Sequence, residues 1–228
     1  ANARQVALSL QGGEIIYFEV DALGNLVEQD KKDLGQEVAA MDLGPLPPGR
    51  QRCRFLAVGC WDNFVRVLSL DPADCMEVIA IKAMPAPVES VSLLDVTPGD
   101  GSAPATTLLL CAGLANGVLM RISLDAQSGD LEKDMTSVLC GRRAVRAAKV
   151  IVGGRAALLA LSSRPWAAYV FHGRFHLSPL CYDALEHASS FCSAQCPEGV
   201  VAVSGNSLRI FAPERLGEAF NEAEVPLR

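Results

Sequence analysis

A strand–turn–strand pattern recurs five times along the 228 residues, and it constrains the fold more than any other feature. The clearest copy consists of the apolar run 55–60, the polar pair Asp62-Asn63 and the alternating run 64–70. Asp and Asn tolerate left-handed backbone angles, so they suit a tight reversal between two strands. Two β-rich runs joined in this way predict a β-hairpin.

The other four copies are centred on similar turns. Each turn lies between two short runs of β-forming residues, and the turn pairs are Gly12-Gly13, Asn116-Gly117, Arg164-Pro165 and Gly205-Asn206. The turns at 12, 62, 116, 164 and 205 follow one another at intervals of 50, 54, 48 and 41 residues. A period of roughly 40 to 50 residues with several short strands per unit is typical of β-propeller blades. Helical repeats can share this period, but they need a 3.6-residue apolar spacing that these runs lack.

Further strands are predicted between the hairpins. We expect inner strands near 37–43, 89–96, 144–152 and 187–193, and outer strands near 26–34, 76–83, 131–139, 175–182 and 218–227. A short helix through Leu180, Ala184, Leu185 and Ala188 is the alternative for the segment before the last unit. Residues 97–105, rich in Gly and Pro, are expected to form a surface insertion.

These elements predict an all-β chain, namely a partial β-propeller with four-stranded, WD40-like blades. About four blades are complete and a fifth is nearly so, because the first unit lacks its opening strand. Propellers of this repeat length close as rings, and an open arc exposes long strand edges. We therefore expect residues 1–228 to be a segment of one propeller domain in a longer chain.

Composition restricts the class of protein further. Half of the residues are apolar, the mean hydropathy is positive and the net charge is −6, which is unfavourable for non-specific nucleic-acid binding. No apolar run approaches the roughly 18 residues that a membrane helix requires. The eight cysteines are irregularly spaced and no signal-peptide pattern opens the sequence, so we expect reduced thiols.

Several longer runs resemble a known family. They are RFLAVG at 54–59, DNFVR at 62–66, SLDP at 69–72, RFHLSPL at 174–180 and QCPEG at 195–199. Together they are similar to the splicing factor 3b subunit 3 family of large propeller subunits, and the resemblance runs from Arg4 to Leu227. The superfamily also contains the large subunits of the damaged-DNA-binding complex and of the cleavage and polyadenylation factor.

The resemblance implies a segment of the second of three propellers in a nuclear subunit of the U2 small nuclear ribonucleoprotein. It implies a non-enzymatic scaffold that supports branch-site recognition, with no cofactor. The implied partners are the helical-repeat subunit and small subunits of splicing factor 3b, with RNA contacted only indirectly. The alternative is an adaptor of a cullin-type ubiquitin ligase, or the large subunit of the cleavage and polyadenylation factor.

Catalytic and metal-binding patterns are weak. Cys192 and Cys196 lie near His187, and His172 is four residues from His176, but no CxxC pair is present. On a strand–turn–strand the two histidines would not share a face. No Gly-x-Ser-x-Gly elbow or phosphate-binding loop occurs, so no catalytic, metal or cofactor residue is predicted.

Five residues are candidate partner contacts. Arg142, Arg143 and Arg146 belong to the most basic run, which suits a solvated face or an acidic partner better than RNA because no stacking aromatic residues are interleaved with it. Trp61 and Trp166 are both expected at hairpin turns, packed between blades. An exposed tryptophan at either position would be a candidate anchor for a protein partner.

Overall fold

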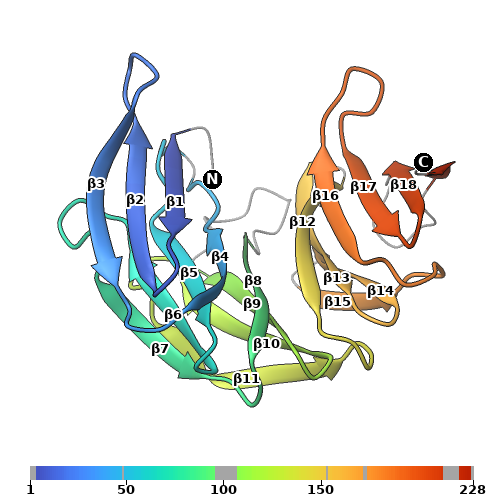
Figure 1. Cartoon of the computed structure of the whole chain (residues 1–228), viewed down its shortest axis with the longest axis horizontal. Helices are drawn as coiled ribbons and strands as arrows, with labels where there is room; N and C mark the ends of the chain where they lie inside the picture. The colour runs from blue at the N-terminus through green and yellow to red at the C-terminus, as the bar shows by residue number, and fades with distance from the viewer. Residues whose placement is uncertain are drawn as a thin grey trace.

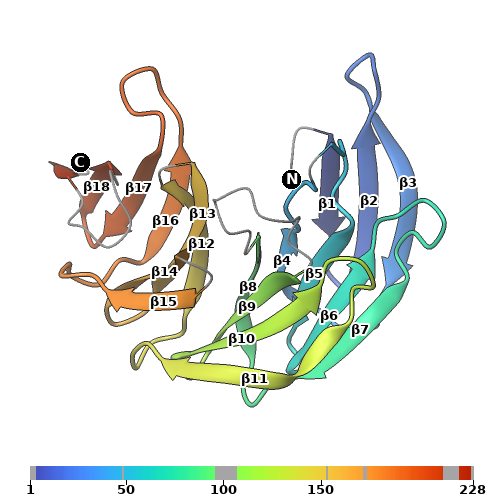
Figure 2. The same cartoon turned by 180° about the vertical axis from the view of Figure 1, so that it is seen from behind.

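Five antiparallel sheets follow one another around an arc (Figures 1 and 2). The computed structural model describes residues 4–47, 49–95, 107–152, 154–171, 174–212 and 221–226. These residues form no helix, so none of them belongs to a helix that is long and apolar enough to cross a membrane. The predicted all-β, partial-propeller fold is confirmed.

Each sheet is one blade, and its strands follow in chain order. Blade 1 has three strands: β1 (Gln5–Ser9), β2 (Glu14–Val20) and β3 (Leu26–Asp33). Blade 2 consists of β4 (Val38–Leu43), β5 (Phe55–Cys60), β6 (Phe64–Ser69) and β7 (Val78–Ala83). Blade 3 consists of β8 (Val88–Asp95), β9 (Thr107–Leu114), β10 (Val118–Asp125) and β11 (Leu131–Leu139).

The last two blades have the same organisation. Blade 4 consists of β12 (Arg146–Val152), β13 (Arg155–Leu161), β14 (Pro165–Phe171) and β15 (Arg174–Pro179). Blade 5 consists of β16 (His187–Phe191), β17 (Gly199–Ser204), β18 (Ser207–Ala212) and β19 (Asn221–Pro226). The first strands of blades 2 to 5 lie side by side on the concave side of the arc, in the order β4, β8, β12, β16 (Figure 1).

The core lies between the blades rather than inside any one of them. Four apolar clusters fill the four junctions between consecutive blades. Along β5 the side chains alternate: Phe55 and Ala57 pack toward blade 3, while Leu56 and Val58 pack toward blade 1. Side chains on a strand point alternately to the two sheet faces, so a strand covered on both faces reads as a continuous apolar run. All six residues of β5 are accordingly buried.

The outermost strands of the blades have the opposite character. In β3 and β11 nearly every residue is exposed or half-buried, and the charged residues lie there as expected. Charge on an outer edge opposes pairing with other molecules. The apolar residues lie on the faces between blades, so an isolated blade would have no buried core. The stability of the fold comes from packing each blade on the next.

Tight turns confirm the hairpin assignment. Asn63 has a φ of 65°, the left-handed angle expected from the Asp62-Asn63 pair, and Gly117 has a φ of 84°. A side chain at Gly117 would also meet the carbonyl of Gly141, which belongs to the linker leading into blade 4. Glycine at this turn thus allows both the backbone angle and the close approach of the next blade.

Some expectations need correction. The segment 180–186 contains no helix, and the strand alternative is confirmed as β16. The outer strand expected over 175–182 ends at Pro179, because its partner strand β14 begins at Pro165 and offers only one further backbone hydrogen bond, from Leu180 N–H to Pro165 O. Residues 97–105 and His172 lie outside the described residues.

Candidate interaction surface

Two kinds of loop meet at one end of the blades. Antiparallel order brings the turn between the second and third strands of each four-stranded blade to the same end as the linker between blades. They are joined by backbone hydrogen bonds: Trp61 N–H donates to Glu37 O (3.1 Å), Cys140 N–H to Gly117 O (2.9 Å) and Val145 N–H to Leu114 O (3.0 Å). We call this end the linker face, and the five predicted contact residues all lie on it or at its margin.

Trp61 projects from the linker face. It occupies the turn between β5 and β6, and 53% of its surface is exposed. Asp62 fixes this turn by accepting hydrogen bonds from Phe64 N–H (3.1 Å) and from the Arg66 guanidinium. The Arg66 hydrogen bond is the main reason why the pKa of Asp62 is lowered. The expectation that Trp61 packs between blades is wrong, because the residue lies at a turn on the linker face and more than half of its surface is exposed.

Trp166 has the opposite environment. It is the second residue of β14 rather than a turn residue, and it packs against the apolar cluster between blades 3 and 4. Its indole Nε1–H donates to the carbonyl oxygen of Cys140 (2.8 Å), at the end of blade 3. The expectation of packing between blades is therefore met by Trp166, which ties blade 4 to blade 3.

Arg142 and Arg143 lie on the linker between blades 3 and 4. The Arg142 N–H donates to Ser163 Oγ (2.9 Å), and the Ser162 hydroxyl donates to Arg143 O (2.6 Å). These bonds fix the backbone of the linker, while both arginine side chains are exposed. Arg164, in the adjoining turn, is exposed as well. Within the part of the chain that the structure describes, none of these three arginines forms an ion pair.

Arg146 lies instead in a row of charged and polar groups on the inner strands. As the first residue of β12 it donates to His187 Nε2 on β16 (2.9 Å) and approaches Glu89 Oε1 on β8 (3.4 Å). Arginine has no acceptor, so the histidine nitrogen must accept this bond. Glu89 was not singled out from the sequence, His187 was considered only as a neighbour of Cys192 and Cys196, and Arg164 only as a turn residue. These residues lie at the beginning of an inner strand or in a turn of the linker face, and that shared position could have identified them from the sequence.

A cavity of about 240 Å³ opens beside this row, between blades 4 and 5. Its lining combines buried aliphatic side chains with exposed charged ones, and the residues are Arg143, Ala144, Arg146, Leu161, Ser162, Leu185, Glu186 and His187. Leu161 and Leu185 are 2% and 3% exposed. The lining therefore combines a small apolar patch from these two leucines with charged and polar groups.

Comparison with known proteins assigns the chain to a family. Residues 1–213 match the family described as RSE1/DDB1/CPSF1 second beta-propeller. The chain belongs to this family. The family name agrees with the arc of blades and with the resemblance seen in the sequence.

Curated relatives within this propeller family are similar over the whole chain. Spliceosome-associated protein 130 A of Arabidopsis thaliana is 47% identical, and splicing factor 3B subunit 3 of Danio rerio is also 47% identical, each over 100% of this chain and 19% of the relative. Pre-mRNA-splicing factor rse1 of Emericella nidulans is 43% identical over 99% of this chain and 19% of the relative. The chain thus spans about a fifth of the length of these relatives.

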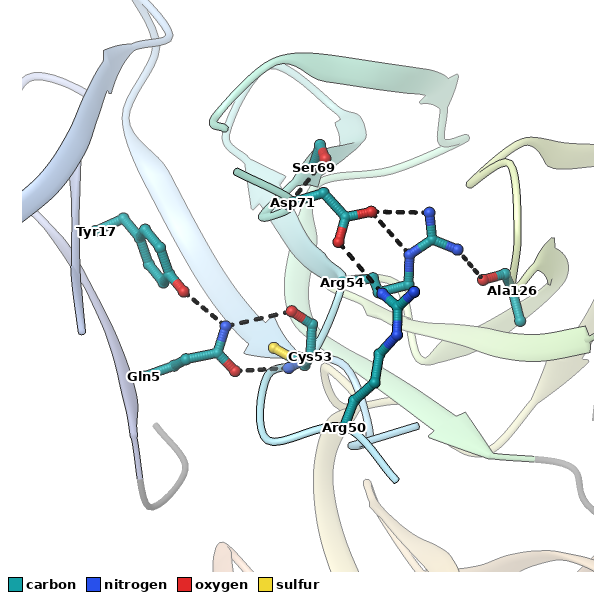
Figure 3. A network of polar contacts seen from close by, with 8 residues as sticks. All are labelled: Gln5, Tyr17, Arg50, Cys53, Arg54, Ser69, Asp71 and Ala126. Carbon is teal, nitrogen blue, oxygen red and sulfur yellow. Dashed lines mark hydrogen bonds and ion pairs between the residues drawn. The ribbon is translucent and has the colours of Figure 1, made fainter. Parts of the chain in front are cut away.

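The opposite end of this propeller segment carries polar ties between blades, shown in Figure 3. Gln5 on β1 accepts from Cys53 N–H (2.6 Å) and donates to the Tyr17 hydroxyl (2.6 Å). Asp71 pairs with both Arg50 and Arg54, and Arg54 also donates to Ala126 O in blade 3 (3.0 Å). The first set joins blade 1 to blade 2 and the second joins blade 2 to blade 3, so both are structural.

A second cavity, of about 350 Å³, lies between blades 1 and 2 at this opposite end. Its lining includes the carboxylates of Glu19, Asp30, Asp74 and Glu77. Glu19 is already engaged, since it accepts from the Tyr17 hydroxyl (2.9 Å) and pairs with Arg52 (2.6 Å). Two of the charged lining residues, Glu19 and Arg52, are therefore held by internal contacts.

The described histidines and cysteines among those considered from the sequence do not gather into a metal site. His176 stacks on Tyr169, with ring centroids 5.5 Å apart. Ser193 N–H donates to Cys196 O across a tight turn, so Cys192 and Cys196 are not opposite each other. The described residues contain no group of three or more His, Cys, Asp or Glu side chains placed to hold a metal, and all eight cysteines are free thiols.

Proposed function

We infer that this chain is a non-enzymatic, protein-binding scaffold segment of the splicing factor 3b complex in the U2 small nuclear ribonucleoprotein. The observation that carries the inference is the similarity of the entire chain, at 47% identity, to a relative named splicing factor 3B subunit 3. Further support comes from the relatives of Arabidopsis and Emericella, whose names also refer to the spliceosome or to pre-mRNA splicing.

The physical mechanism of such a scaffold is preorganisation. Four apolar clusters and several cross-blade hydrogen bonds, such as those from Trp166 and Arg54, hold the blades in fixed relative positions. A partner that binds a stiff surface does not have to overcome the entropy of ordering that surface. The rigid strands would present the loops of the linker face, including Trp61, in one arrangement.

In this proposal the chain is part of the second of three propellers in a nuclear subunit. The helical-repeat subunit and small subunits of splicing factor 3b are its partners, and RNA is contacted only through them. No bond is made or broken by the chain. The buried polar groups support this role, because Gln5, Ser90 and Ser162 all serve hydrogen bonds between blades or to linkers.

Purification of the tagged full-length protein from nuclear extract tests the proposal. We expect splicing factor 3b subunits and U2 RNA to co-purify in stoichiometric amounts. Recovery of a cullin, or of cleavage and polyadenylation factors, without U2 RNA would instead support the alternative functions within the same superfamily. A tagged, unrelated propeller protein expressed at the same level is the control for non-specific association.

A further inference from the structure

The linker face carries a compact basic site at the junction of blades 3, 4 and 5. It consists of the cavity between blades 4 and 5 together with Arg142, Arg143 and Arg164, and we call it the basic corner. We propose that the basic corner binds an acidic segment of a partner protein, with one carboxylate side chain seated in the cavity. This inference rests on the proposed scaffold function, because it specifies the chemistry of one partner-binding site.

The arginines of the basic corner are available to a ligand. Within the described residues Arg142, Arg143 and Arg164 are exposed and form no ion pair, although their backbones are joined by hydrogen bonds through Ser162 and Ser163. Arginine presents a planar fork of donors that matches a carboxylate in two-point contact. Fixed backbones with free guanidinium groups are suited to capturing carboxylates that arrive from outside.

The shape and lining of the cavity suit a single side chain. A volume of about 240 Å³ corresponds to roughly eight water molecules, so it accommodates one side chain and not a folded element. Leu161 and Leu185 offer a small apolar patch to a methylene stem, and Arg143 is among the charged lining residues. Glutamate combines an aliphatic stem with a terminal carboxylate, and therefore matches both parts of the lining.

The lining of the cavity also distinguishes a protein partner from RNA. The lining contains no Phe, Tyr or Trp side chain, and its one aromatic ring, His187, is already engaged by Arg146, so bases would find little to stack on. The chain as a whole carries a net charge of −6, which opposes a long polyanion but affects a short acidic segment less. A phosphate group also has no aliphatic stem to place against the two leucines. The lining therefore favours a carboxylate side chain.

Two further charges in the cavity refine the site. Arg146 is already held by Glu89 and His187, which leaves Arg143 as the lining arginine that is free to pair with a ligand. Glu186 also lines the cavity and is exposed, so its carboxylate repels an incoming acidic group. Substitutions at Arg143 and Glu186 should therefore change binding in opposite directions.

The test uses the full-length protein and a fluorescein-labelled, capped hexaglutamate peptide, followed by fluorescence anisotropy at low salt. We expect saturable binding that weakens as salt is raised, since exposed ion pairs are screened. Arg143→Ala should weaken binding about fivefold, equivalent to about 1 kcal/mol, and Glu186→Gln should strengthen it. Arg155→Ala is the matched control, because Arg155 is exposed at the opposite end of the same blade.

The outcomes are distinct. A hexaglutamine peptide should not bind, and a hexauridine RNA should neither bind the corner nor lose affinity in the Arg143→Ala variant. Equal binding of hexaglutamate to the wild type and the Arg143→Ala variant would overturn the inference, as would RNA binding that depends on Arg143. If splicing factor 3b subunits co-purify but the peptide does not bind, this inference alone fails. If the peptide binds but no splicing factor co-purifies, the proposed function alone fails.

Discussion

Lys149 on β12 forms an ion pair with Asp42 on β4, with Nζ 2.5 Å from Oδ2. Lys149 also donates to the carbonyl oxygen of Leu43 (2.9 Å), which lies 106 residues earlier, and Asp42 accepts from Leu93 N–H on β8 (2.7 Å). One charged pair thereby joins the inner strands of blades 2, 3 and 4. Burial raises the pKa of Asp42 even though Lys149 acts to lower it. The pair therefore stabilises the arc only as long as both partners are present.

Lys149→Met should loosen the inner strands. Breaking the pair leaves Asp42 largely buried without its cation, at a cost of about 1–3 kcal/mol, less than for a fully buried pair because Lys149 is partly exposed. An acid whose folded-state pKa is raised contributes most stability below its ordinary pKa and loses it as pH rises through the folded value. Amide hydrogen exchange in β4 and β12 should therefore be faster in the variant at pH 7, with a difference that shrinks on acidification.

The double variant Asp42→Asn with Lys149→Met is the control for this pair. It removes both charges, so it should recover most of the protection that Lys149→Met loses. Exchange in β18, which does not contact the pair, should be unchanged in both variants. Wild-type protection in the Lys149→Met variant at pH 7 would show that the pair does not support the arc.

Trp61 and Trp166 should separate binding from stability. Trp61→Ala removes an exposed side chain, so the local opening free energy measured by amide hydrogen exchange should change by less than about 0.5 kcal/mol. Binding of the protein partner should weaken. Trp166→Phe leaves Cys140 O without its indole donor, which should cost about 1–3 kcal/mol near the junction of blades 3 and 4. Quantitative co-precipitation and hydrogen exchange give the two measurements, and a destabilising Trp61→Ala would contradict the assignment.

Thiol reactivity should follow burial. Desolvation raises the pKa of Cys111 to about 12 and those of Cys53 and Cys140 to about 11, whereas Cys181 and Cys192 are exposed. Alkylation requires the thiolate, so the three buried thiols should remain unmodified in the native protein at pH 8 while the two exposed ones react. Mass spectrometry of peptides after brief iodoacetamide treatment measures this, with the denatured protein as the control for full labelling. Early modification of Cys111 would show that blades 3 and 4 separate readily.

The 228-residue chain produced alone should self-associate. Among the described residues β1 pairs only with β2, and the exposed Leu8 and Leu10 lie on it or directly after it. Such an edge is a template for pairing with another molecule. Sedimentation velocity should show oligomers, and Leu8→Lys should reduce them more than Leu139→Lys, which changes an exposed residue on the outer strand of blade 3. A monomer that melts cooperatively would contradict this expectation.

Local sequence determined the hairpins, because the information needed for a turn and two strands lies within about 20 residues. Asp62-Asn63 and Asn116-Gly117 predicted turns with left-handed backbone angles, and the charged run in β11 indicated an outer strand. The alternation of Phe55 and Leu56 also encoded the two faces of a blade. The fold class and the number of blades were therefore predictable from the sequence.

Only the tertiary structure decided which side chains meet across blades. Trp61 follows β5 and Trp166 lies near the start of β14, so both are close to a turn. Trp61 is exposed to solvent, whereas Trp166 packs against the neighbouring blade and donates to Cys140 O. The contacts of Lys149 with Asp42, and of Arg146 with Glu89 and His187, join residues far apart in the chain. Such contacts depend on how each twisted sheet is seated on the next, and no short-range pattern encodes that relative placement.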